Sequence, residues 1–203
     1  LTNNGYTEIV LTGIHTGNYG VDINSSFAEL LREIVKINAL ERLRISSIEV
    51  TELNDEVLDI IKNNKVIVDH LHIPLQAGSD SVLKNMNRKY DLNYFKNKIK
   101  EIRSIREDIS ITTDIIVGFP LESDDDFLET LETAKTIAFS KIHVFPYSIR
   151  NHTVAATMKQ VYGNVKKERA RQLLKLSRVL EEEYAQKFIG KSLMVLTENS
   201  KDG

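Results

Sequence analysis

The sequence predicts an α/β fold in which parallel strands, each followed by a helix, form a partial barrel. Short apolar strands alternate with amphipathic helices along most of the chain, and polar residues recur on one face of several strands. The turn after the first strand reads LTGIHTGNYG and lacks the G-x-G-x-x-G spacing of a dinucleotide-binding sheet. With 203 residues and 41% apolar content, the chain is long enough for one large domain.

The first part of the chain alternates strand and helix twice. The segment 8–13 is a short apolar strand, and apolar residues recur at helical spacing in 25–37 behind a serine that can cap the helix. The segment 43–50 is the next strand. The helix predicted over 54–64 follows, with Asn54 as its expected cap.

The stretch HLHIPLQAGSD, residues 70–80, begins as the third strand and stops in a turn. Its leucines and isoleucine alternate with His70, His72 and Gln76, which therefore share one face. That face looks either into a polar cavity or out to solvent.

The remaining elements continue the alternation. A short helix near 79–87 and a longer one from Asp91 lead to the fourth strand, 110–118. The helix 123–137 carries three aspartates in its first turn, where the helix dipole favours negative charge. The fifth strand is 141–148. Such a strand–helix repeat implies a parallel sheet with right-handed crossovers.

Polar residues also mark the fourth and fifth strands, with Thr112 and Asp114 on one and His143 and Tyr147 on the other. A row of this kind suits the inside of an incompletely filled barrel, with the apolar residues facing the helices.

The last predicted helix, 165–188, is basic in its first half, where Lys166, Lys167 and Arg169 stand close together. We expect a solvated helix that packs its leucines on the barrel, and an RNA-facing patch is the alternative.

Composition narrows the classes of function. The net charge is −2, and with no cysteine the chain cannot form disulfides, zinc–cysteine sites, a catalytic thiolate or a cysteine-held iron–sulfur cluster. No apolar run is long enough to span a bilayer and the start does not resemble a signal peptide, so we expect a cytoplasmic protein without membrane contact. Both ends resemble cuts, which predicts a fragment of a longer protein.

Ligands of parallel α/β barrels lie at the carboxyl ends of the strands. The residues predicted there are rich in hydroxyl, amide and glycine, which suits a cradle for a polar, ribose-like molecule. The His70-x-His72 pair is either a metal pair or a hydrogen-bonded interior pair. Asp114 on its apolar strand needs a partner or a ligand, and Arg88 is either a surface residue or an anion clamp.

Five motifs together resemble the radical S-adenosylmethionine methylthiotransferases. LTGIHTGNYG, RISSIEVTEL, HLHIPLQAGSDSVLKNMNRKY, TTDIIVGFPLESDDDF and VFPYSIRNHT occur in the order and spacing of that family, over nearly the whole chain. The likeness points to the branch that methylthiolates threonylcarbamoyladenosine beside the tRNA anticodon.

This resemblance implies a partial (βα)6 barrel over 1–163 with five strands present and the first βα unit missing, a connecting helix over 164–190 and the first strand of an RNA-binding TRAM β-barrel over 191–203. It implies S-adenosylmethionine and two [4Fe–4S] clusters in the full-length protein, with the tRNA anticodon stem-loop and an electron donor as partners. The family's cluster cysteines precede the matching region. We therefore expect no cluster and no catalysis in this fragment alone.

The resemblance assigns cofactor-binding roles by position. For the methionyl part it implies Thr12 and Gly13 near the amine, Ser47 and Glu49 at the next strand end, Gln76 and Ser79 near the ribose and methionyl part, and Arg88 at the carboxylate. For the adenosyl part it implies Asp114 and Gly118 beside the group, and Pro146 and Tyr147 in backbone contact with adenine. Two departures occur. Leu121 replaces the second glycine of Gly-Phe-Pro-Gly-Glu, and His152-Thr153-Val154 replaces Gly-Thr-Pro.

Two other functions fit parts of the sequence. The first is a metal-dependent barrel hydrolase that uses His70 and His72. The second is a non-catalytic RNA-binding module that uses the basic half of the last helix. The sequence also leaves open a ribosomal-protein substrate, which a sister branch of the resembled family modifies.

Overall fold

The computed structural model of the chain describes residues 1–195. Most of the predicted TRAM strand falls on 196–203, outside the described residues, and 191–195 carries no regular secondary structure. The TRAM assignment therefore stays a prediction.

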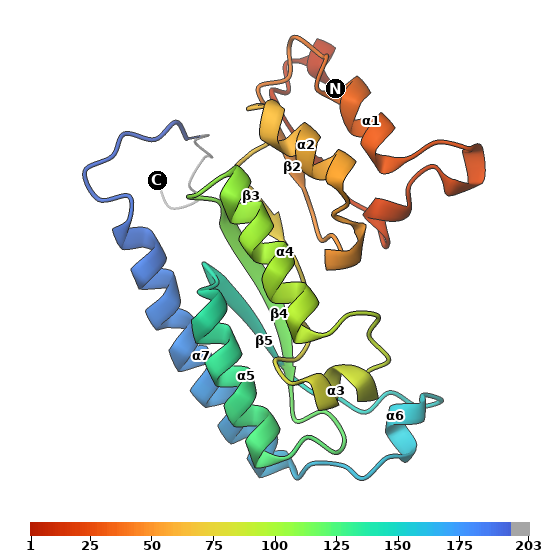
Figure 1. The fold of residues 1–203 in the computed structure, drawn as a ribbon, viewed down its shortest axis with the longest axis vertical. Helices are drawn as coiled ribbons and strands as arrows, with labels where there is room; N and C mark the ends of the chain where they lie inside the picture. The colour runs from red at the N-terminus through yellow and green to blue at the C-terminus, as the bar shows by residue number, and fades with distance from the viewer. Residues whose placement is uncertain (196–203) are drawn as a thin grey trace.

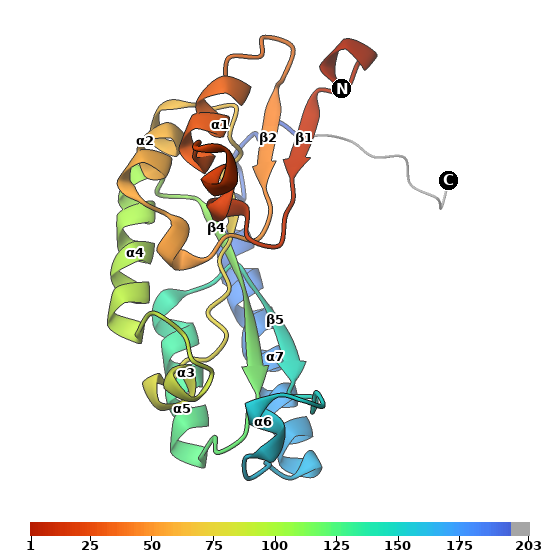
Figure 2. The same cartoon turned by 90° about the vertical axis from the view of Figure 1, so that its right-hand side faces the viewer.

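All five predicted strands form, and they pair in parallel. They are β1 (Glu8–Leu11), β2 (Arg42–Ile45), β3 (His70–His72), β4 (Ser110–Val117) and β5 (Lys141–Pro146). β1 pairs with β2, and β3, β4 and β5 pair in that order. Bridges from Leu43 to Ile67 and from Ser47 to His72 connect β2 with β3. The strands thus follow one another in chain order, which is the order of a partial barrel and confirms the predicted fold class (Figure 2).

The predicted helices also form, each within a few residues of its expected bounds. They are α1 (Phe27–Ile34), α2 (Asp55–Asn63), α3 (Asp80–Asn85), α4 (Leu92–Ile105), α5 (Asp124–Ile137) and α7 (Gly163–Gln186). The side chains of Ser26, Asn54, Asp91 and Ser123 accept a backbone N–H three residues on, as N-caps do. The sequence patterns did not predict α6 (Val154–Thr157) or the short 3₁₀ helices Thr2–Asn4, Thr16–Asn18, Val21–Ile23 and Val50–Glu52.

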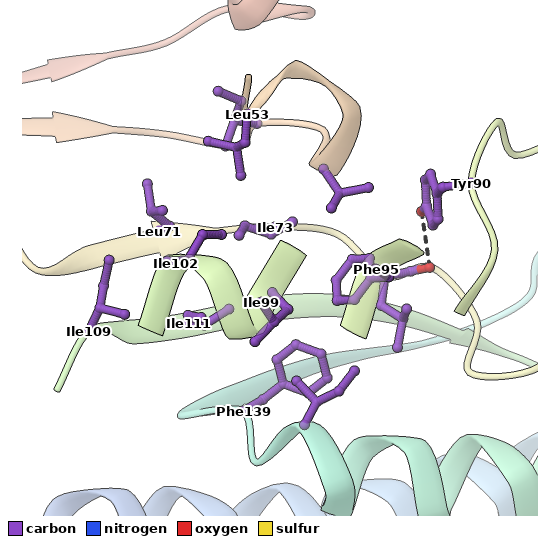
Figure 3. Packing of buried hydrophobic residues seen from close by; sticks show 14 of the residues in the cluster. Leu53, Leu71, Ile73, Tyr90, Phe95, Ile99, Ile102, Ile109, Ile111 and Phe139 are labelled. Atoms are coloured by element: carbon purple, nitrogen blue, oxygen red, sulfur yellow. Dashed lines mark hydrogen bonds between the residues drawn. The ribbon is translucent and has the colours of Figure 1, made fainter. Parts of the chain in front are cut away.

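The helices lie on one side of the strands, and the apolar core fills the space between. Figure 1 shows α4, α5 and α7 side by side, and Figure 2 shows α1, α2 and α4 on the same side of the strands. Figure 3 shows Leu71 of β3 beside Ile102 of α4, and Ile111 of β4 beside Ile99 of α4. All four side chains are buried, because alternation directs every second strand residue to the helices.

Helix α7 packs along β5 as part of the same unit. Leu173 and Leu180 are buried, and the Ser177 hydroxyl accepts the Ile142 N–H (3.0 Å). These contacts confirm that the helix packs its leucines on the barrel. Among the helices of residues 1–195, none combines the length and the apolar character needed to cross a bilayer.

Candidate functional site

The strand face opposite the helices is polar. His70 and His72 of β3, Thr112 and Asp114 of β4, and His143 of β5 share this concave face, as the alternation predicted. His72 pairs in register with Thr112, and Asp114 pairs with His143, so the two pairs lie on adjacent levels of the same face.

Hydrogen bonds connect these side chains in a row. The Thr112 hydroxyl lies 3.2 Å from His70 Nε2 and 2.9 Å from His72 Nδ1. On its other side, His72 Nε2 lies 3.3 Å from Asp114 Oδ1. Burial lowers the pKa of His70 to about 4, with Arg44 and His72 adding to the effect, so His70 is neutral at physiological pH.

This arrangement answers the question raised by His70-x-His72. Both imidazoles have a nitrogen within hydrogen-bond distance of the same threonine hydroxyl, as expected of a hydrogen-bonded interior pair. A hydrolase with His70 and His72 as its metal ligands does not fit this geometry. Asp114 has the partner that it was expected to need, and that partner is His72.

A second polar region lies in the loops that follow β1, β2 and β3. A hollow of about 500 Å³ is lined by His15, Gly17, Asn18, Glu49, Thr51, Glu52, Asn54, Asn87, Arg88, Lys89 and Tyr90. The structure thus brings together Glu49 and Arg88, whose side chains form an ion pair (3.1 Å). Arg88 Nε is buried without a hydrogen-bond partner among the described residues. Glu49 therefore restrains one edge of the guanidinium, while the buried Nε is left unpaired.

Gln76 lies four residues beyond the end of β3, which is shorter than predicted, and has an uncommon backbone conformation. Its φ is +66°, in the left-handed region, while its N–H donates to the Asp114 carbonyl and its own carbonyl accepts the Ile116 N–H (both 2.8 Å). A left-handed residue other than glycine, asparagine or aspartate is unusual, and such residues concentrate at functional sites. The half-buried side chain of Gln76 is thereby held beyond the end of β3 by a locked backbone.

The turn after β4 fixes Gly118. Its φ is +70°, and a Cβ added there would lie 2.4 Å from Lys166 Cγ. The Gly118 N–H donates to Glu122 Oε1 (2.9 Å), and the same oxygen accepts from Arg169 Nη1 (2.6 Å). The GFPLES motif is therefore a turn closed by a buried ion pair with α7.

Both departures from the resembled family fall on left-handed residues. Leu121 has φ +69° and His152 has φ +66°, at the positions where that family commonly has glycine. The backbone keeps the glycine-type conformation, in which a side chain clashes with its own backbone and strains the residue.

The other predicted cofactor residues have varied surroundings. Ser79 is fully buried, and its hydroxyl donates to Asp126 on α5 (2.5 Å), so it joins the start of α3 to α5. Thr12, Gly13, Ser47 and Pro146 are exposed in the loops or at the strand end.

Tyr147 lies apart from the concave-face row. Its ring packs edge-on against Phe119 (5.1 Å between centroids), and its carbonyl accepts from Lys166 Nζ (3.2 Å). Its backbone N–H donates to Val117. Both backbone groups of Tyr147 thus already have partners, so its expected adenine contact stays a prediction.

One of the three basic residues named for an RNA-facing patch is buried in the structure. Arg169 is only 5% exposed and is bound to Glu122 and Asp124, and Lys166 lies on Tyr147. Of the three basic residues named for this patch, Lys167 alone is exposed.

Sequence reasoning missed two features of this region. His143 was placed on the polar face but was not included among the binding residues, and the partnership of Arg169 with Glu122 was not foreseen. A polar residue in register with Asp114 was the available signal for His143. No local signal links Arg169 to Glu122, because 47 positions separate them.

Comparisons with known proteins agree with the partial-barrel fold. A family model described as the radical SAM superfamily matches residues 1–134. Among solved structures, coproporphyrinogen III oxidase (HemN) from Escherichia coli, a radical SAM enzyme, superposes with a TM-score of 0.66 at 18% identity, over 86% of this chain and 40% of that one. That likeness concerns the fold alone.

Curated relatives match nearly the whole chain. The threonylcarbamoyladenosine tRNA methylthiotransferase MtaB of Bacillus subtilis (strain 168) is 44% identical over 98% of this chain, and that of Thermotoga maritima is 46% identical over 96%. A tRNA-2-methylthio-N(6)-dimethylallyladenosine synthase of Acetivibrio thermocellus is 41% identical over 98%. The chain spans 45%, 45% and 42% of these relatives, which is less than half of each.

Proposed function

The chain belongs to the radical SAM superfamily, and we propose that it is the cofactor-positioning part of an enzyme that transfers a methylthio group to an adenosine of tRNA. The proposed nucleoside is N6-threonylcarbamoyladenosine, next to the anticodon. The identity of 44–46% to two methylthiotransferases of that nucleoside supports the proposal. A tRNA substrate also suggests a cytoplasmic location.

The geometry that carries the proposal is the loop hollow with Arg88 at its wall. An amino-acid carboxylate is a natural ligand for a guanidinium, and Arg88 lines this hollow with its buried Nε unpaired among the described residues. Glu49 holds Nη1 and so restrains the group. These residues fit the methionyl end of S-adenosylmethionine.

We propose that the adenosyl end lies near the turn after β4, beside Gly118 and Gln76. Gln76 has a left-handed backbone and bridges to Ile115 of β4. When bound, S-adenosylmethionine supplies both a radical source and a methyl group. The contribution of this chain is to hold the cofactor in one orientation and to keep water from it.

Iron–sulfur clusters do not fit the residues of this chain. Such clusters are held by cysteine thiolates, and none of the 203 residues is a cysteine. The two clusters and their electron donor are therefore proposed for the complete protein, and no step is assigned to them here.

The activity can be tested with the complete protein. Its expression in bacteria that lack methylthiolated tRNA, followed by mass spectrometry of tRNA nucleosides, should give the methylthio derivative of threonylcarbamoyladenosine. If only the methylthio derivative of dimethylallyladenosine forms, the protein acts on the nucleoside of the other class of relatives. If tRNA stays unmodified and a ribosomal protein gains the methylthio group, the proposed substrate is wrong.

The assignment of Arg88 has its own test. In the complete protein, Arg88→Gln should weaken S-adenosylmethionine binding about 10-fold or more, because a charge-assisted hydrogen bond contributes about 1.5–3 kcal/mol. Arg171→Gln, at an exposed arginine of α7, is the matched control and should bind normally. Equal S-adenosylmethionine binding by both variants would show that Arg88 does not contact the cofactor.

Gln76 can be tested without damage to the fold. Gln76→Gly retains the left-handed backbone while removing the side chain, so weaker cofactor binding would report the side chain itself. Asn24→Gly, at an exposed residue with φ +54°, is the control for the backbone effect. Unchanged binding by Gln76→Gly would mean that the side chain does not contact the cofactor.

A further inference from the structure

We propose that His72, Asp114 and His143 form a binding site for one divalent transition-metal ion of the zinc type. The three residues come from β3, β4 and β5, and they present their side chains on the concave face. One ligand atom from each lies within 4.8 Å of the others. We call this set the concave triad.

The spacing of the first two ligands already suits a metal. Two atoms bound tetrahedrally to one zinc ion, each at about 2.0–2.1 Å, lie about 3.3 Å apart. His72 Nε2 and Asp114 Oδ1 lie 3.3 Å apart. The exposed ring of His143 lies beside that of His72, with 5.7 Å between the ring centroids.

The surroundings of His72 match those of a metal-bound imidazole. Such a histidine donates its second ring N–H to a neighbouring oxygen, which fixes the ring and its tautomer. His72 Nδ1 lies 2.9 Å from the Thr112 hydroxyl, which leaves Nε2 for the metal. The hydroxyl can in turn donate to His70 Nε2 (3.2 Å), so the row of hydrogen bonds supports the ligand.

Charge favours the same conclusion. Within residues 1–195, no lysine or arginine nitrogen lies within 4.0 Å of the Asp114 carboxylate, and His72 is the neighbour in that range. A half-buried carboxylate beside two imidazoles offers a cation one negative and two neutral ligands, the donor set of zinc and ferrous sites. With three protein ligands, at least one coordination position stays open toward the concave side.

The test uses this chain, because it carries all three ligands. Cobalt(II), which replaces zinc and absorbs visible light when bound tetrahedrally, is titrated into protein treated with a chelator. We expect one equivalent to bind with strong visible bands, to be displaced by zinc, and to raise the melting temperature.

The variants identify the ligands. His72→Ala, His143→Ala and Asp114→Asn should each abolish the bands. Thr112→Val should weaken binding about 10-fold, because it removes the hydrogen bond that orients the His72 ring. His15→Ala and His152→Ala, at exposed histidines outside the triad, are the controls and should bind normally. Circular dichroism of the metal-free variants verifies that each is folded.

Two results would overturn the proposal. Without saturable cobalt or zinc binding, the triad is a hydrogen-bonded cluster only. If binding persists in His72→Ala and His143→Ala but is lost in a control, the ion lies elsewhere. Neither result bears on tRNA methylthiolation, which is measured separately in the complete protein.

Discussion

The buried ion pair between Arg169 and Glu122 should be a main support of the turn that holds Gly118. Arg169 Nη1 donates to Glu122 Oε1 (2.6 Å), and Nη2 donates to Asp124 (2.7 Å). The side chains of Arg169 and Glu122 are only 6% and 3% exposed, so water and salt screen the pair little. The pair fastens α7 to the loop between β4 and α5.

Arg169→Met keeps most of the side-chain volume and removes the charge. Glu122 would then be a buried carboxylate without a cation, and breaking a buried pair in this way costs about 3–5 kcal/mol. Burial raises the pKa of Glu122 even beside Arg169. In the variant the carboxyl therefore gains a proton more readily, and the loss of stability should be larger at pH 8 than at pH 5.

Urea unfolding followed by circular dichroism measures this loss. Arg171→Met is the matched control on the same helix, because Arg171 pairs with Glu168 in full exposure and should leave the unfolding free energy unchanged within error. The double variant Arg169→Met with Glu122→Gln should regain part of the stability. The reasoning is refuted if Arg169→Met unfolds at the same urea concentration as Arg171→Met, or if the second substitution restores nothing.

Three further outcomes are expected. Leu121→Gly should stabilise the protein by up to about 1 kcal/mol. The left-handed conformation costs an L-residue about 1–2 kcal/mol, and the greater conformational entropy of glycine in the unfolded chain offsets part of the relief. A lower urea midpoint would contradict this. Phe95→Ala should destabilise the protein by about 3–5 kcal/mol, since the ring is fully buried between α4 and the strands. A loss under about 1 kcal/mol in urea unfolding would show that neighbouring side chains move to fill the cavity. Burial alone would raise the pKa of Asp126, but hydrogen bonds from Ser123, Ser79 and Ser81 outweigh it and lower the pKa to about 2. Its contribution to stability is therefore complete above about pH 4 and is lost as the pH falls toward 2, so Asp126→Asn should flatten the acid limb of a pH–stability curve, and an unchanged limb would exclude this role.

The sequence by itself determined the elements and their order. Serine, asparagine and aspartate caps at Ser26, Asn54 and Asp91 are local signals, since each side chain binds a backbone N–H only three residues away. The alternation in 70–76 likewise separates the buried leucines from the histidines without reference to any other strand. Local chemistry thus sufficed for the parallel α/β class and for a polar concave face.

The tertiary structure decided which polar residues meet. Register between β3, β4 and β5 brings His72, Asp114 and His143 together, although about 70 positions separate the first from the last. The same long-range packing buries Ser79 against Asp126 and withdraws Arg169 from the exposed face of its helix. Pairings between segments distant in sequence depend on how strands and helices pack, and no local pattern records them.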